Sequence, residues 1–181
     1  MKVYHSGFNI IEKPDLDHGR DNADFSKGFY LSPDKEFVLR WAKFRKGETT
    51  YINTYELETE GLSIRVFHKE EAWFEYIFNN RHFMKDLYEE DVIIGPIAND
   101  TIYDTFGIIS SGLLSTKEAM ALLMIGEEYT QVVLKSQRAL EQLRFIESEI
   151  VKEEDIREYQ AMLKKEEEEF QKQFVACLQK M

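Results

Sequence analysis

The spacing of apolar and polar residues divides the first third of the chain into short strands, a loop and a helix. Strands are predicted at residues 2–5 and 29–31, and the polar stretch between them, residues 9–26, is predicted to be a long loop. Loops of this length inside a compact domain are usually functional or mobile. Residues 50–58 alternate between two faces, which is typical of a strand with one face in solvent, and residues 62–67 predict another strand.

A helix is predicted to begin directly after residues 29–31. Ser32 is expected to cap it, Pro33 to occupy its first position, and Asp34 to favour the positive end of its dipole. Gly47 is expected to end this helix. Its apolar face is formed at helical spacing by Phe37, Val38, Trp41 and Ala42.

Two further helices and a short helical link are predicted in the middle of the chain. Residues 69–80 are expected to turn inward a face formed by Ala72, Trp73, Tyr76 and Ile77. Ser115 and Glu118 have the spacing of a capping box, which predicts a helix through Met124, and residues 136–140 predict the link. The remaining strands are predicted at residues 91–95, 129–134 and 143–146. Many short strands with few helices between them indicate an α+β fold.

The C-terminal segment differs in character from the rest of the chain. Residues 151–181 contain no Gly or Pro and are rich in charge, and four residues recur at intervals of seven: Ile156, Leu163, Phe170 and Cys177. With Tyr159 and Phe174 between them, they predict one long amphipathic helix, and the glutamates at 166–169 predict a solvated face. This helix either packs on its own domain or contacts a partner or a second copy of the chain. We expect a domain at residues 1–150 and a helical extension at 151–181.

Charge and cysteine content narrow the possible functions. The formal net charge of −11 argues against non-specific DNA binding, although it leaves room for a nucleic-acid substrate in a local groove. The single cysteine, Cys177, excludes an internal disulfide and a Cys-based zinc site. No apolar run approaches the roughly 20 residues that span a bilayer, so no membrane partner is expected. A reducing, cytoplasmic location is the expected one.

Common site motifs are absent from the sequence, and three short segments remain as candidates. The glycines form no dinucleotide-binding or phosphate-loop pattern, and the histidines show no close metal spacing, so no metal site is expected. The candidates are His5-Ser6-Gly7 at the end of the first strand, residues 24–32 (DFSKGFYLS), and residues 128–134 (EYTQVVL). Each also has a structural interpretation, because strand-end histidines and strand aromatics commonly belong to a core.

Taken together, these segments resemble the ADP-ribosyltransferase fold, in its His–Tyr–Glu branch that includes diphtheria toxin and the poly-ADP-ribose polymerases. The segments that carry the resemblance are HSG, and KGFYLS followed by a helix with an aromatic residue. The runs GRDNADFSKGFYLS, WFEYIFNNR and DVIIGPIANDTIY are similar to the DUF3990 family of bacterial proteins, which belongs to that superfamily and often occurs beside small antitoxins. The resemblance covers about residues 3–147. It implies split antiparallel β-sheets with flanking helices and a cleft for NAD between them.

The resemblance implies a role for each matching residue. His5 would hydrogen-bond the ribose hydroxyls of NAD, and the backbone of Ser6 and Gly7 would hold the nicotinamide amide. Tyr30 would pack on the nicotinamide ring, and Trp41 stands where a second stacking aromatic is expected, unless it is a core residue of its helix. Arg20 could meet the pyrophosphate, because Arg is suited to bidentate phosphate contacts.

The position of the family's catalytic glutamate carries Gln131 instead. A neutral amide can still hydrogen-bond a ribose hydroxyl, but it lacks the charge that favours an oxocarbenium-like transition state. The resemblance therefore implies a mono-ADP-ribosyltransferase that uses NAD as a substrate, acts on a macromolecule and serves as a toxin with an antitoxin partner. The alternatives are a catalytically degenerate NAD-binding or protein-interaction module of the same fold, and an NAD glycohydrolase.

Four further polar residues fall in the runs that are similar to the family. Asn79, Arg81, Asn99 and Asp100 could line the cleft or the acceptor site. For Asp100 a turn or helix-cap role after Pro96 is the alternative.

Overall fold

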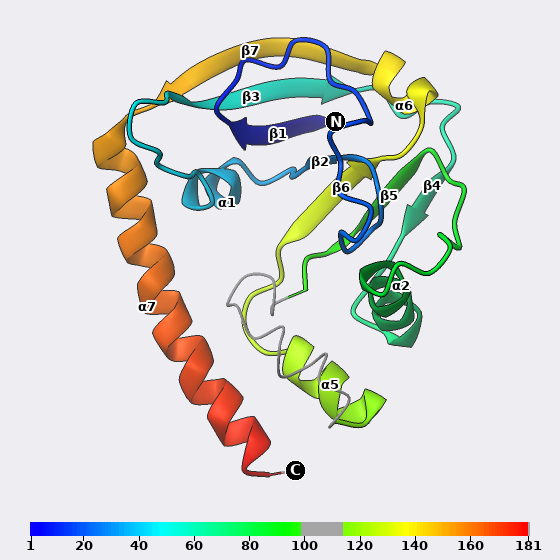
Figure 1. Ribbon diagram of the computed structural model, residues 1–181, viewed down its shortest axis with the longest axis vertical. Coiled ribbons are helices and arrows are strands. Elements are labelled where there is room, and N and C mark those ends of the chain that lie inside the picture. The colour runs from blue at the N-terminus through cyan, green and yellow to red at the C-terminus, as the bar shows by residue number, and fades with distance from the viewer. Residues whose placement is uncertain (99–113, 181) are drawn as a thin grey trace.

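The structure, a computed structural model, describes residues 1–98 and 114–180, arranged as two β-sheets with helices around them (Figure 1). The elements in chain order are β1 (Lys2–Gly7), β2 (Phe29–Leu31), α1 (Lys35–Arg40), β3 (Thr50–Leu57), β4 (Ile64–Val66), α2 (Glu71–Arg81), β5 (Val92–Pro96), α5 (Thr116–Leu123), β6 (Thr130–Leu134), α6 (Gln137–Glu141), β7 (Leu143–Val151) and α7 (Glu153–Leu178). The α+β class and the long C-terminal helix are as predicted. The final strand β7 is longer than the predicted 143–146.

The two sheets differ in strand direction. One has the order β1-β3-β7 and is antiparallel throughout, and the other has the order β2-β6-β5-β4. In the second sheet β4 pairs with β5 in parallel, which departs from the expected antiparallel sheets. Helix α2 lies between these two strands in the sequence, and a crossover of this kind returns the chain in the same direction.

The two sheets are joined where β1 passes the end of β2. The Tyr4 N–H donates to the Ser32 carbonyl at 2.8 Å, and the Ser32 N–H donates back to the Tyr4 carbonyl at 3.0 Å. The core beneath this bridge includes Val3, Phe29 and Tyr55, which are buried together with residues of β6. This bridge places the end of β1 directly beside β2.

Strand β3 is buried on both faces, so the expectation of a half-solvated strand is wrong. It is the central strand of its sheet, between β1 and β7. One face is covered by the loop after β1, because the Asn53 side chain bonds the Ile11 N–H and the Tyr55 hydroxyl donates to the Ile11 carbonyl. On the other face Ile52 packs against Phe37 of α1. The alternation of residues along β3 therefore distinguishes a face covered by a loop from a face covered by a helix, and does not distinguish a core face from a solvent face.

Helix α1 begins and ends at residues other than those predicted. Asp34 is the cap, since its side chain accepts from the Phe37 N–H at 3.1 Å, and Pro33 precedes the cap. Ser32 lies before the cap, where its backbone forms the bridge to β1 and its hydroxyl donates to the Thr130 carbonyl while accepting from the Asp34 N–H at 3.2 Å. The helix ends at Arg40, and Gly47 adopts a φ of 85° in a later turn.

The predictions for α2 and α5 differ in outcome. Trp73, Tyr76 and Ile77 of α2 are buried as predicted. The fourth buried residue of this face is Asn80, at helical spacing from the other three, and Ala72 is exposed. The capping box of α5 is confirmed, with the Ser115 side chain and the Glu118 side chain each bonding the other residue's backbone. The link α6 is also present, and Ser136 caps it.

Helix α7 runs along one side of the molecule and packs on its own chain (Figure 1). Ile156 lies in the cluster of α1 that contains Phe37, and Phe170 and Phe174 are buried against Leu122 of α5. Of the glutamates at 166–169, three are exposed as predicted, while Glu166 is half-buried and pairs with Arg40 of α1. Through this buried face the helix packs on the rest of its own chain, which was the first of the two expected arrangements.

Candidate functional site

A cavity of about 680 Å³ lies between the end of β1, strand β2, helix α1 and the loop after β1. This volume is within the roughly 300–1,000 Å³ that is typical of small-molecule sites. Six of the seven predicted site residues line it: His5, Ser6, Arg20, Tyr30, Trp41 and Gln131. Gly7 is absent from the described lining, although a Cβ there would lie 3.5 Å from Nε2 of His5.

The His5 imidazole is fixed in one orientation beside β2. Its Nδ1 lies 2.9 Å from the Tyr30 carbonyl, which can only accept, so Nδ1 carries the proton and donates. The ring also packs on Phe29, with centroids 5.0 Å apart. Burial lowers the pKa of His5, although the bond to Tyr30 opposes this shift. The imidazole is therefore neutral near pH 7, with Nε2 as an acceptor that no described residue engages.

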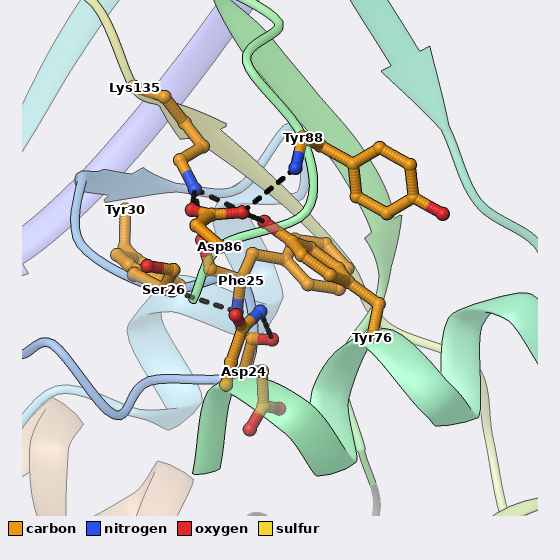
Figure 2. Close-up of polar contacts among 9 residues, drawn as sticks. Asp24, Phe25, Ser26, Tyr30, Tyr76, Asp86, Tyr88 and Lys135 are labelled. Atoms are coloured by element: carbon orange, nitrogen blue, oxygen red, sulfur yellow. Dashed lines mark hydrogen bonds and ion pairs between the residues drawn. The ribbon is translucent and has the colours of Figure 1, made fainter. Parts of the chain in front are cut away.

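The Tyr30 side chain is held by the turn that precedes β2. Its hydroxyl donates to the Ser26 carbonyl at 2.7 Å and accepts from the Phe25 N–H at 3.0 Å (Figure 2). Burial, and then the nearby Asp24 charge, raise the pKa of Tyr30 well above its ordinary value. The phenol therefore stays protonated, and because both hydrogen-bonding roles of its oxygen are occupied, the ring is what the residue offers to the cavity.

Gln131 brings an unsatisfied polar group to the cavity. It lies on β6 opposite Gly95 of β5, and its side chain is 6% exposed. Its Nε2 is buried and has no hydrogen-bond partner among the described residues. An unpaired buried amide costs roughly 1–3 kcal/mol, a cost that a hydrogen bond from Nε2 to an acceptor would remove.

The remaining predicted residues lie at different depths. Trp41 caps the C-terminal end of α1, packs on Phe37 at 5.7 Å and has a buried Nε1 without a partner among the described residues. It therefore lies in the helix core and in the cavity lining at once. Arg20 is exposed on the loop, close enough to Tyr30 that its charge opposes the rise in the pKa of that phenol.

A buried ion pair forms part of the cavity lining. Arg81, at the end of α2, contacts Asp24 at 2.8 Å, and both side chains are 9% exposed. Both residues line the cavity, whereas Asn79 is not among the described lining residues. The other two candidates of this group, Asn99 and Asp100, lie outside the described residues.

Behind Tyr30 a second polar network supports the same turn (Figure 2). Lys135, directly after β6, donates to the Phe25 carbonyl and to the Tyr76 hydroxyl, each at 3.1 Å, and forms an ion pair with Asp86. Tyr76 in turn donates to Asp86 at 2.8 Å. The network therefore ties α2 and β6 to the backbone that binds the Tyr30 hydroxyl.

The loop after β1 contributes a pair that the sequence analysis missed. Asp15 and His18 both line the cavity, and the His18 Nδ1 lies 2.7 Å from Asp15 Oδ1. Their spacing of three residues in a polar loop is common and points to no particular chemistry. Only the fold shows that this loop passes over the site.

Residues 1–145 match the DUF3990 family, described as "Protein of unknown function (DUF3990)". The chain belongs to the DUF3990 family. Every described residue that lines the cavity falls inside the DUF3990 match, from Tyr4 to Gln131. Helix α7 lies beyond it.

The other comparisons add one partial similarity to the DUF3990 match. A protein of Aliarcobacter butzleri (strain RM4018), named probable nicotinate-nucleotide adenylyltransferase, is 32% identical over 78 residues. The similarity covers 43% of this chain and 36% of that protein. No solved structure matches the chain.

No described helix has the length and apolar character needed to cross a membrane. Nor do the described residues gather three or more His, Cys, Asp or Glu side chains in a metal-binding cluster.

Proposed function

We propose that this chain is an NAD-dependent mono-ADP-ribosyltransferase that modifies a macromolecule and acts as a toxin held in check by an antitoxin. The observation that carries the proposal is that His5, Tyr30 and Gln131, from three different strands, line one and the same cavity. Its size and its mixture of aromatic rings and hydrogen-bonding groups suit a dinucleotide. The partial relative covers too little of either protein to carry its activity over.

The orientation of His5 suits a ribose. The neutral ring presents Nε2 as an acceptor, and a ribose hydroxyl is a donor of matching strength. Tyr30, fixed through its hydroxyl, presents a ring face on which the nicotinamide can stack, worth about 0.5–1.5 kcal/mol beyond burial. Gln131 would donate its free N–H to a ribose oxygen. These contacts grip the neutral sugar while its bond to nicotinamide breaks.

Charge stabilisation is the weaker part of this site. The transition state at the anomeric carbon is oxocarbenium-like, and a carboxylate stabilises it better than an amide. Two carboxylates line the described cavity, and each already has a partner: Asp24 pairs with Arg81, and Asp15 pairs with His18. We therefore expect slow transfer of single ADP-ribose units and no polymer synthesis.

Calorimetric titration with NAD and chromatographic detection of released nicotinamide test the proposal. His5→Ala is expected to weaken NAD binding about two- to thirteenfold, because it removes one net hydrogen bond of about 0.5–1.5 kcal/mol. Tyr30→Ala should weaken binding through lost stacking, while Tyr30→Phe should bind like wild type because it keeps the ring. His68→Ala, at an exposed histidine outside the lining, is the matched control.

Gln131 favours one alternative, an NAD-binding module without catalytic activity. That function would give NAD binding without nicotinamide release. Release without labelling of any macromolecule would instead identify an NAD glycohydrolase. Absence of NAD binding at millimolar concentration by the folded wild-type chain would refute the proposal.

A further inference from the structure

The loop after β1 carries a hydrogen-bonded Asp–His pair at the mouth of the cavity. Oδ1 of Asp15 accepts from His18 Nδ1 at 2.7 Å and from the backbone N–H groups of Asp17 and His18 at 2.8 and 3.3 Å. The His18 side chain is 89% exposed and that of Asp15 is 49% exposed. The carboxylate thus fixes the tautomer with the proton on Nδ1 and leaves Nε2 as the basic nitrogen.

A close backbone contact fixes where this pair lies. A Cβ on Gly19 would stand 2.7 Å from the Gly28 carbonyl oxygen and 2.8 Å from the Gly28 nitrogen, so only glycine fits. Gly28 in turn packs on β6 and precedes Tyr30 by two residues. His18, adjacent to Gly19, is therefore held next to the backbone that leads into β2, and it lines the same cavity as Tyr30.

The other polar groups of the described cavity are unsuited to removing a proton from an incoming acceptor. Gln131 has no basic atom, and Tyr30 keeps its proton because its pKa is raised. Asp24 is buried in its ion pair with Arg81. His5 is buried, its Nδ1 is bound to the Tyr30 carbonyl, and the proposed function gives its Nε2 to the ribose.

We propose that His18, positioned by Asp15, is the general base that activates the acceptor for ADP-ribose transfer. This inference rests on the proposed function. The acceptor oxygen forms a bond to the ribose anomeric carbon as the bond to nicotinamide breaks, and that electron pair leaves with neutral nicotinamide. The acceptor proton passes to His18 Nε2, the Asp15 carboxylate stabilises the imidazolium, and the exposed ring returns the proton to solvent. No electrons are exchanged with a redox partner.

The electrostatics of the loop agree with this role. The hydrogen bond and charge of Asp15, with a smaller contribution from the Asp17 charge, raise the pKa of His18 above its ordinary 6.5. A base is active when deprotonated, so transfer should increase as the pH rises through this raised pKa. The other charged residues that line the described cavity are Arg20, Asp24 and Arg81, and His5 is the other titratable imidazole in that lining.

The test measures nicotinamide release from NAD, with water as the acceptor, alongside the NAD dissociation constant by calorimetry. His18→Gln is expected to lower the release rate about a hundredfold, the lower end for general base catalysis, while NAD binding is unchanged. Asp15→Asn keeps an oxygen for the loop N–H groups but loses the charge, so its pH–rate profile should shift to lower pH. His68→Gln, at an exposed histidine outside the described lining, is the matched control.

The outcomes separate this inference from the function on which it rests. Wild-type release from His18→Gln, or an equal loss of binding and rate, overturns the role of His18 and leaves the transferase proposal standing. A folded wild-type chain that neither binds NAD nor releases nicotinamide overturns both. A rate loss confined to His18→Gln, with an altered pH profile for Asp15→Asn, supports the assignment.

Discussion

Replacing Lys135 with Met tests whether the buried network behind Tyr30 stabilises the fold. The Lys135 side chain is 9% exposed and that of its partner Asp86 is 28% exposed. Removing one partner of a buried ion pair costs about 3–5 kcal/mol because the other charge is left unpaired. Since Asp86 keeps partial access to water, we expect the lower end, about 3 kcal/mol, which for a chain of this length lowers Tm by about 6–12 °C.

The assay is urea unfolding followed by circular dichroism. Lys85→Met, at an exposed lysine one residue before Asp86, is the matched control and should be nearly neutral. Lys135→Met combined with Asp86→Leu should recover part of the loss, because it removes the unpaired charge as well. A loss below about 1 kcal/mol for Lys135→Met, or a double variant less stable than the single one, would refute the reasoning.

The stabilisation that Lys135 provides depends on pH, and the pKa of Asp86 sets the direction of this dependence. Burial raises the pKa of Asp86, but the hydrogen bonds from Lys135 and Tyr76 outweigh burial and hold it below its ordinary 3.8. The stabilisation is therefore complete above pH 3.8 and is lost as the pH falls through the lower folded-state pKa. The stability difference between wild type and Lys135→Met should accordingly shrink in acid below this pH, measured by the same unfolding experiment.

Three other substitutions have expected outcomes that unfolding experiments can check. Tyr30→Phe should cost about 1–3 kcal/mol, because the Phe25 N–H loses its acceptor in a partly buried turn; an unchanged midpoint would contradict this. Ser115→Ala should cost about 1 kcal/mol by removing the capping box, and Ser115→Asp should recover it. Gly28→Ala should cost about 1–3 kcal/mol, because the new Cβ would stand 2.6 Å from Val133 Cγ1, and wild-type stability would show that this approach relaxes freely.

Features set by neighbouring residues could be predicted from the sequence. The capping box at Ser115 and Glu118 spans three residues and needs no tertiary context, so it is present as expected. Ser32 carried an equally good capping signal, and its hydroxyl does accept from the Asp34 N–H, but its backbone is paired with Tyr4 of β1 and the helix begins two residues later, with Asp34 as its cap. A helix cap could therefore be predicted from neighbouring residues only where no distant strand pairs with the backbone of the capping residue.

Burial depends on contacts that periodicity does not encode. The alternation along β3 indicated two different faces, yet it could not show that a distant loop and a helix cover them both. The pair Asp24 and Arg81 joins residues far apart in the chain, and no spacing rule connects them. Likewise, no sequence pattern marks Asp15 and His18 as site residues, because their position at the cavity depends on the contact of Gly19 with Gly28. His5, Tyr30 and Gln131 were found through family resemblance, because their types alone are ordinary strand residues.

The pairing of β7 with β3 has a consequence for the design of truncated fragments of this protein. The family match stops at residue 145, but β7 continues to Val151 and pairs there with residues 50–54 of β3. A fragment cut at the match boundary would leave that stretch of β3 as an open edge with unpaired backbone groups. Open edges recruit strands from other molecules, so such a fragment should self-associate during expression. Recombinant versions meant for solution work should therefore retain at least the whole of β7.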